Sequence, residues 1–138
     1  MRIDSRLVMS DEQAITGTAA STSHIDLGAD RNIGAGEPLW WVVFCSEDFT
    51  LLTSLSMSLE SDDNSSFSSP VAKLTESKTL AQLAAGVRVV AQRLPDGLER
   101  YIRSKYTVTG TDPDAGKLTS CIAKAPELRK LYAKNYSV

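Results

Sequence analysis

The sequence predicts an all-β fold, an antiparallel β-sandwich of jelly-roll-like form with about eight strands. Apolar and polar residues alternate over residues 51–60 and again over 102–109, and this period of two is that of a strand with one buried face. Clusters of turn-forming residues follow at 61–70, 95–97 and 111–116. Short strands separated by such turns at regular spacing are typical of sandwiches and barrels.

The N-terminal part contains weaker signals. Residues 2–9 alternate loosely and indicate either an extended arm or a first strand. Residues 10–13 begin with serine and end with glutamine, a pair that can satisfy each other's backbone donors and so cap a helical turn. Residues 19–23 have little to bury and indicate a loop. Residues 25–27 indicate a short strand that Gly28 ends.

A loop with two glycines over residues 32–38 precedes the most apolar run of the chain, Leu39–Cys45. The β-branched and aromatic residues of this run fit a strand that is buried on both faces. Trp40 and Trp41 are neighbours on it, so one side chain must point into the core and the other outward. The outward tryptophan is an interface candidate, because an exposed indole ring is costly unless a partner covers it.

In the strand at residues 51–60, the odd-numbered positions from Leu51 to Leu59 are expected to face the core and the even-numbered positions from Leu52 to Glu60 mostly water. Residues 61–70 then reverse the chain, because short polar side chains bond to their own backbone. The Asp-Asp-Asn sequence at 62–64 offers oxygen ligands for calcium. Its spacing is not that of a calcium-binding loop, so a plain turn is favoured.

The C-terminal half continues the strand pattern. Residues 71–74, 86–94, 102–109 and 117–124 indicate strands, and residues 78–83 are ambiguous between a strand and a helical turn. We expect a single domain over 1–138, with an extended N-terminal arm within 1–22 and a short tail at 126–138. In this tail Leu128, Leu131 and Tyr132 have helical spacing, which indicates a short helix or a docking arm.

Composition is that of one globular domain. The chain has 138 residues, of which 42% are hydrophobic and 23% charged. The first residues lack the apolar core of a secretory signal, and the longest apolar run is too short to span a membrane, so no membrane partner is expected. Cys45 and Cys121 are expected to be reduced and buried in a protein made in the cytoplasm, with a disulfide as the less favoured alternative.

The net charge of −2 hides an asymmetry between the two halves of the chain. Residues 1–63 contain three basic and eleven acidic residues, whereas residues 64–138 contain twelve basic and six acidic residues. Two solvated faces of one domain are the simpler explanation. The alternative is a self-complementary or docking surface on which opposite fields orient neighbouring molecules.

The sequence contains no residue pattern typical of an active site. The single histidine, His24, adjoins Ser23 and Asp26, but neighbours on a strand point to opposite faces and catalytic triads are rarely local. One histidine and two distant cysteines do not make a metal site. The Gly-Ala-Gly sequence at 34–36 lacks the third glycine of a dinucleotide site. We therefore expect a protein that is not an enzyme and that uses no cofactor and no metal.

A nucleic-acid surface is the main rival to protein docking. Two strands that are expected to be adjacent contain five basic residues and one aromatic residue: Arg88, Arg93, Arg100, Arg103, Lys105 and Tyr101. A basic sheet face with an aromatic ring can grip a single strand. The overall acidic balance argues against this, so a solvated or protein-docking face is favoured and no direct nucleic-acid contact is expected.

An ordered series of short segments resembles the capsid cement (decoration) proteins of tailed bacteriophages. The resemblance extends from Ile3 to about Lys124 and is weaker over the tail. The segments are residues 7–11, 13–16, 19–22, 25–28, 33–39, 61–63, 67–70, 94–97 and 100–103.

The resemblance implies a jelly-roll-like sandwich on the capsid exterior of a virion, made in the bacterial host cytoplasm. Its partners would be the phage major capsid protein and further copies of itself, as a homodimer or homotrimer. Contacts are expected from Leu7, Met9, Trp41, Tyr132 and Tyr136. The alternative is a carbohydrate- or host-surface-binding module on a phage particle, for which an outward tryptophan would suit sugar stacking.

Overall fold

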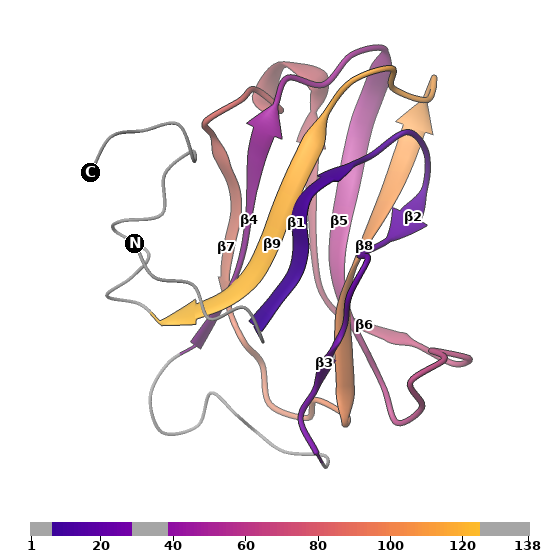
Figure 1. Ribbon diagram of the computed structural model, residues 1–138, viewed down its shortest axis with the longest axis vertical. Helices are drawn as coiled ribbons and strands as arrows, with labels where there is room; N and C mark the ends of the chain where they lie inside the picture. Colours follow the sequence, from indigo (N-terminus) through magenta and orange to yellow (C-terminus); the bar gives the residue numbers. More distant parts are fainter. Residues whose placement is uncertain (1–6, 29–38, 125–138) are drawn as a thin grey trace.

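Two antiparallel sheets packed face to face make up the computed structural model, which describes residues 7–28 and 39–124 (Figure 1). The expected all-β sandwich is confirmed. Sheet A contains, in order, β1 (Val8–Ala14), β9 (Lys117–Lys124), β4 (Leu39–Glu47) and β7 (Arg88–Arg93). Sheet B contains β2 (Ala19–Ala20), β8 (Tyr101–Gly110), β5 (Leu52–Asp62) and β6 (Val71–Thr79), and β3 (Ile25–Asp26) also pairs with β8.

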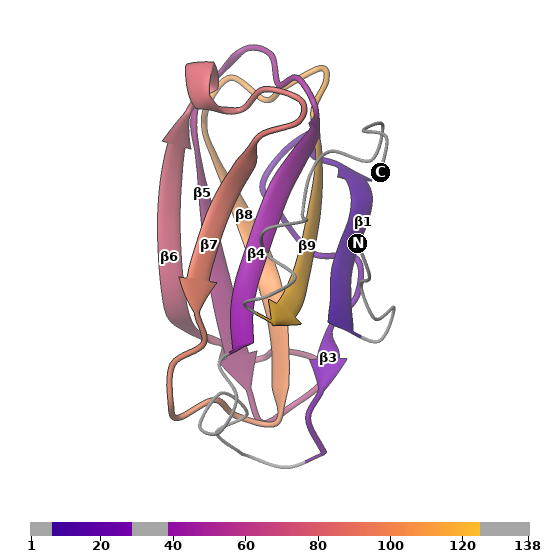
Figure 2. The same cartoon turned by 90° about the vertical axis from the view of Figure 1, so that its left-hand side faces the viewer.

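The strands pair in a nested order. The first strand β1 lies beside the last strand β9, β2 pairs with β8, β4 with β7, and β5 with β6. In the view of Figure 2, which is turned by 90° from Figure 1, sheet A lies in front of sheet B. Consecutive strands therefore often belong to different layers, and segments from both ends of the sequence contribute to the same sheet.

One apolar core lies between the sheets. It is formed by the inward residues of β4, β5, β8 and β9, among them Trp41, Met57, Ile102 and Leu118, all of which are fully buried. The alternation predicted for residues 102–109 is confirmed, because Ile102, Ser104 and Tyr106 are buried while their neighbours are not. Burial of this apolar area is the main source of stability.

A polar network crosses the core and fixes how the two sheets face each other. The Tyr106 hydroxyl on β8 lies 2.7 Å from the Ser10 hydroxyl on β1 and donates to the Ser120 hydroxyl on β9 at 2.9 Å. The Trp41 indole N–H donates to the Ser104 hydroxyl at 3.1 Å. Burial raises the pKa of Tyr106, so this phenol of sheet B stays neutral where it contacts β1 and β9 of sheet A.

The N-terminal expectations need correction over the described residues. An extended arm within 1–22 is wrong from Val8 onward, because β1 pairs with β9 and Met9 and Ile15 are fully buried. The capped helical turn at 10–13 is also wrong. Ser10 does donate to the Gln13 side chain at 2.7 Å, but within a strand that two register shifts distort. Residues 1–6 lie outside the described part.

The start of β5 departs from simple alternation. Leu52 is buried and Leu51 is exposed, the reverse of the prediction. Leu51 has a positive φ of 68°, and the register with β8 shifts between Leu52 and Ser54. This bulge moves one residue across the sheet, so Leu52 joins Leu55, Met57 and Leu59 in the core.

The other boundaries lie close to those expected. β4 is buried on both faces as predicted, and β9 covers the predicted residues 117–124. The ambiguous segment at 78–83 contains the end of β6 and a single 3₁₀ turn, Leu80–Gln82. Cys45 and Cys121 are both buried thiols. The loop at 32–38, with its 34–36 glycine turn, and the tail at 126–138 lie outside the described residues.

Candidate functional site

The five residues expected to form contacts do not form one surface. Leu7 is partly buried against the main core. Met9 and Trp41 are fully buried, so their assignment to an interface is wrong: both side chains point between the sheets. Tyr132 and Tyr136 lie outside the described residues.

The tryptophan pair shows why the assignment failed. One of the two does face outward, but it is Trp40, which is partly buried on the outer side of sheet A. The register pairs Trp41 with Gln92 and Ile122, and Ile122 belongs to the main core. A period of two predicts that the side chains of neighbouring residues point to opposite faces of a sheet. It does not identify which of the two faces the core.

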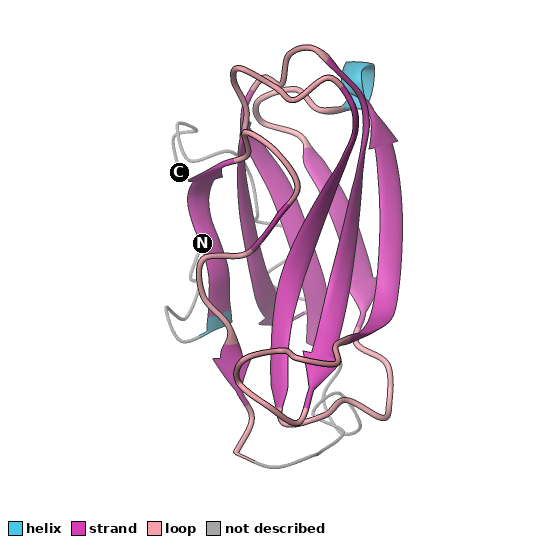
Figure 3. Ribbon diagram, turned by 90° about the vertical axis from the view of Figure 1, so that its right-hand side faces the viewer, coloured by secondary structure: helices cyan, strands magenta, loops and turns pink. Residues whose placement is uncertain are grey.

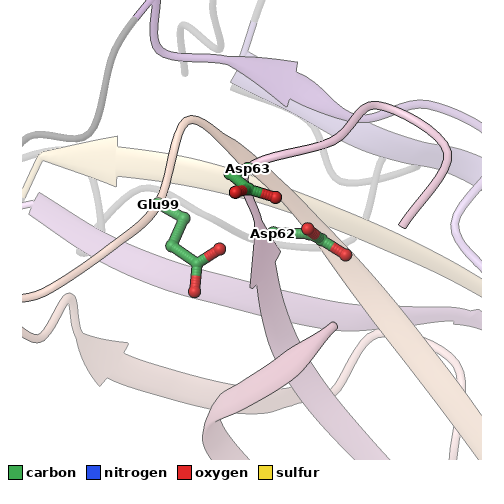
Figure 4. Close-up of side chains that lie close together, drawn as sticks. All are labelled: Asp62, Asp63 and Glu99. Carbon is green, nitrogen blue, oxygen red and sulfur yellow. The ribbon is translucent and has the colours of Figure 1, made fainter. Parts of the chain in front are cut away.

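An acidic cluster forms where the β5–β6 loop approaches the loop before β8. Carboxylate oxygens of Asp62, Asp63 and Glu99 lie within 4.8 Å of one another, and Figure 4 shows the three side chains close together. The sequence pointed to the two aspartates, whereas Glu99 comes from a segment distant in the chain. Nothing in the spacing of residues 62–64 could have identified it.

Asp62 organises its own loop. Its carboxylate accepts hydrogen bonds from the backbone N–H groups of Asn64 at 3.1 Å and Ser69 at 2.8 Å. Burial opposes ionisation of this group, but hydrogen bonds from Ser69, Asp63 and Asn64 outweigh it and lower the pKa of Asp62. These bonds support the interpretation of residues 61–70 as a turn, because both carboxylate oxygens already stabilise the loop backbone.

Rings and cations gather beside this loop. The His24 ring packs edge-on against Phe67 and Tyr101, with centroids 5.8 Å and 5.5 Å apart. Arg103 lies 4.2 Å above the centre of the Phe67 ring and also pairs with Glu60 at 3.0 Å. His24 is thus an exposed histidine in ring contacts, as the sequence favoured over a triad.

The Arg100–Asp26 pair leads to a prediction on pH. Arg100 donates from Nε and Nη2 to the two oxygens of the Asp26 carboxylate, at 2.8 and 3.1 Å. This bond, with a second from the Gly28 N–H, lowers the pKa of Asp26 to about 2. Because the folded pKa is below the unfolded one of about 3.9, stabilisation by this pair is present above pH 4 and is lost as the pH falls toward 2.

Carboxyl chemical shifts measured by NMR check this prediction. We expect Asp26 to titrate near pH 2 in the native chain and closer to pH 4 in Arg100→Ala. An Asp26 pKa near 4 in the native chain would contradict the arrangement.

The basic residues do not form one face. Arg88 and Arg93 lie on β7 in sheet A, whereas Arg103 and Lys105 lie on β8 in sheet B. The expected adjacency of these two strands is therefore wrong, because the connection between them crosses from one layer to the other. Arg100 and Arg103 are also each paired with a carboxylate.

The strands of sheet B are drawn in Figure 3, and the outer side of this sheet presents rows of residues with hydroxyl groups. The register aligns them across β6, β5 and β8, and we call this surface the hydroxyl face. Its first two rows are Thr79–Ser54–Thr109 and Ser77–Ser56–Thr107, and the third is Thr75–Ser58–Lys105. The β6 members, Thr107 and Thr109 are exposed, and the β5 serines are partly buried between them.

The free edge at β6 is protected against pairing with a further strand. Glu76 and Lys78 align with Met57 and Leu55, whose side chains point into the core. The two charges form an ion pair at 3.2 Å, and Glu76 accepts a hydrogen bond from Gln92 on β7. Inward-pointing charges on an edge strand oppose the addition of another strand. Faces of the sandwich are therefore better suited to docking than this edge.

Comparison with protein families gives one result. The model of the Bbp16 family matches residues 9–122. The chain belongs to the Bbp16 family. The match covers all of sheet A and sheet B except the first residue of β1 and the last two of β9. A search of curated proteins finds no match. Within the described ranges, no helix has the length and apolar character to cross a membrane.

Proposed function

We propose that this Bbp16-family protein is a non-enzymatic structural protein of a phage virion, which binds the outer capsid surface as a small homo-oligomer and cements neighbouring major capsid proteins. The ordered resemblance to capsid cement proteins supports this proposal. The nested strand pairing also supports it, because it is the arrangement that a jelly-roll-like sandwich requires.

The hydroxyl face is the observation that carries the proposal. Serine and threonine side chains lose little rotamer freedom on binding, and their hydroxyls both donate and accept hydrogen bonds. Three register-aligned rows on a sheet supported by a continuous core make a firm surface for docking. Contacts of this kind are individually weak, but they become durable when several copies bind a symmetric shell.

The carbohydrate-binding alternative loses the feature that favoured it. It relied on an outward tryptophan as a stacking platform, but Trp41 is fully buried and the indole nitrogen of Trp40 is buried as well. We therefore retain only the capsid proposal.

Lysine substitutions on the hydroxyl face test the proposal. In co-sedimentation with empty capsids of the phage that encodes the chain, Ser77→Lys and Thr107→Lys should each weaken binding at least about tenfold, because a docked lysine would be desolvated without a partner. Both positions are exposed, so the unfolding temperature should change little.

The matched control is Ser68→Lys, at an exposed position in the β5–β6 loop, which should bind as the native chain does. Native-like binding by both face variants would overturn the assignment of this face. No binding by the native chain itself would overturn the proposed function.

A further inference from the structure

Exposed apolar side chains gather at one end of the sandwich, where β4 and β6 end and β5 and β7 begin (top of Figure 1). Among the described residues, four large apolar side chains are exposed, and three of them lie in the two loops at this end. They are Leu51, Leu80 and Val87, which are 53%, 36% and 41% exposed. The fourth, Val71, begins β6 at the opposite end. We call Leu51, Leu80 and Val87 the apolar tip.

The two loops that form the apolar tip hold each other in place. The Asp48 carboxylate accepts a hydrogen bond from the Ala85 N–H at 2.7 Å, and the Phe49 N–H donates to the Leu83 carbonyl at 3.2 Å. Phe49 and Leu83 are both buried in the main core. The loops therefore present their exposed side chains in a fixed arrangement, and a preorganised surface loses less entropy on docking.

The loop over residues 80–87 offers a partner mainly apolar groups. It contains no charged residue, and its one polar side chain is Gln82. The Gln82 side-chain oxygen accepts hydrogen bonds from the Thr79 N–H at 2.9 Å and the Thr79 hydroxyl at 3.3 Å, which cap the 3₁₀ turn. An exposed apolar patch beside polar residues is typical of an interaction site.

The backbone at Leu51 gives a further reason to assign this tip to a contact with another molecule. Leu51 has a φ of 68°, a conformation that is unfavourable for a residue with a side chain and that glycine adopts readily. Its side chain is exposed, so it gains little from the core of its own chain. Folding of this chain alone therefore does not explain a leucine at this position.

The apolar tip has an acidic border. Asp48 and the two aspartates of the β8–β9 loop, Asp112 and Asp114, are exposed. The Asp114 N–H donates to the Thr50 hydroxyl at 3.1 Å, which places the β8–β9 loop beside the β4–β5 loop. None of the three aspartates forms an ion pair with another described residue. Arg88, which follows Val87, offsets only one of these charges.

The acidic border selects the kind of partner. A contact between the same surface of two copies would bring the aspartates of both copies together, and like charges across an interface are unfavourable. A lipid surface with anionic headgroups attracts basic segments and not acidic ones. An acidic border instead complements a protein surface on which basic side chains surround an apolar socket.

We propose that the apolar tip docks into an apolar socket with a basic border on the shell protein of the capsid. The first row of the hydroxyl face contains Thr79, which directly precedes Leu80. The tip and the hydroxyl face are therefore continuous and suit a single partner. The inference rests on the proposed function and deepens it, because it adds a second contact and states the chemistry of the site on the capsid.

Co-sedimentation with empty capsids of the phage that encodes the chain tests the tip. Leu80→Ser with Val87→Ser should weaken binding at least about tenfold, because two apolar side chains no longer leave water on docking. The matched control is Val71→Ser, at the exposed apolar position of the opposite end, which should bind as the native chain does.

Leu51→Gly separates a role in docking from a role in folding. Glycine relieves the positive φ of this position, so the unfolding temperature should stay the same or rise. Loss of the exposed side chain should still weaken capsid binding at least about fivefold. This variant also decides the test if the double serine variant fails to fold, as judged by far-UV circular dichroism. Native-like capsid binding by Leu51→Gly would contradict the proposal.

Salt dependence tests the acidic border. Capsid binding by the native chain should weaken as the salt concentration is raised from about 0.05 M to about 0.5 M. Asp112→Asn with Asp114→Asn should remove most of this dependence. The same salt dependence in this variant and in the native chain would show that these aspartates do not face a basic border.

The outcomes separate this inference from the proposed function. Native-like capsid binding by the double serine variant would overturn the inference and leave the proposed function in place, whereas no binding by the native chain would overturn both. Self-association of the native chain that the double serine variant loses would assign the tip to a second copy. Binding to vesicles of phosphatidylcholine and phosphatidylglycerol that this variant loses would assign it to lipid. Either result would overturn the inference.

Discussion

Replacing Trp41 by alanine should lower the free energy of unfolding by about 4 kcal/mol. The indole ring is fully buried at the centre of sheet A, and its N–H donates to the Ser104 hydroxyl. The substitution therefore leaves a large cavity and removes the hydrogen bond that the Ser104 hydroxyl accepts. Urea unfolding followed by far-UV circular dichroism measures the change.

The neighbouring residue is the matched control. Trp40→Ala removes the same side chain from the outer side of sheet A, where it is only partly buried, and should cost about half as much. A larger loss from Trp40→Ala than from Trp41→Ala would contradict the assignment of Trp41 to the core.

Gly116→Ala should lower the free energy of unfolding by about 3 kcal/mol. Gly116 has a φ of 137°, and a Cβ added there would lie 2.5 Å from the ring of Phe49. Phe49 is buried and fixed by its backbone bond to Leu83, so it has little room to move. The turn before β9 therefore requires glycine for both its conformation and its close packing.

A second glycine separates these two causes. Gly97 also has a positive φ, 83°, but a Cβ added there meets no atom within 4 Å. Gly97→Ala should thus cost only the backbone strain, about 1 kcal/mol. Equal losses from the two variants, measured by the same urea titration, would show that the contact with Phe49 does not matter.

Much of the fold could be predicted where alternation and turn chemistry agree. β8 has the expected faces because it keeps a period of two between clear turns, and β9 has the expected bounds. The prediction failed where the backbone departs from that period. β1 contains two register shifts and a positive φ at Glu12, and β5 begins with a bulge.

The candidate surfaces were harder to predict, because they depend on which strands meet. The serines of β5 were expected to face water, but the hydroxyl face arises from their alignment with β6 and β8. The basic residues of β7 and β8 were expected to share a face, yet the two strands belong to different sheets. Glu99 lies close to Asp62 only because the two loops that contain them lie close together in the fold.

The most direct test of the proposed cementing role is the heat resistance of DNA-filled capsids. Capsids that lack this protein would be heated with and without the purified native chain, and the temperature at which a DNA-binding dye gains access would be recorded. We expect the native chain to raise that temperature and Thr107→Lys to leave it near that of bare capsids. The same release temperature with and without the native chain would contradict the account.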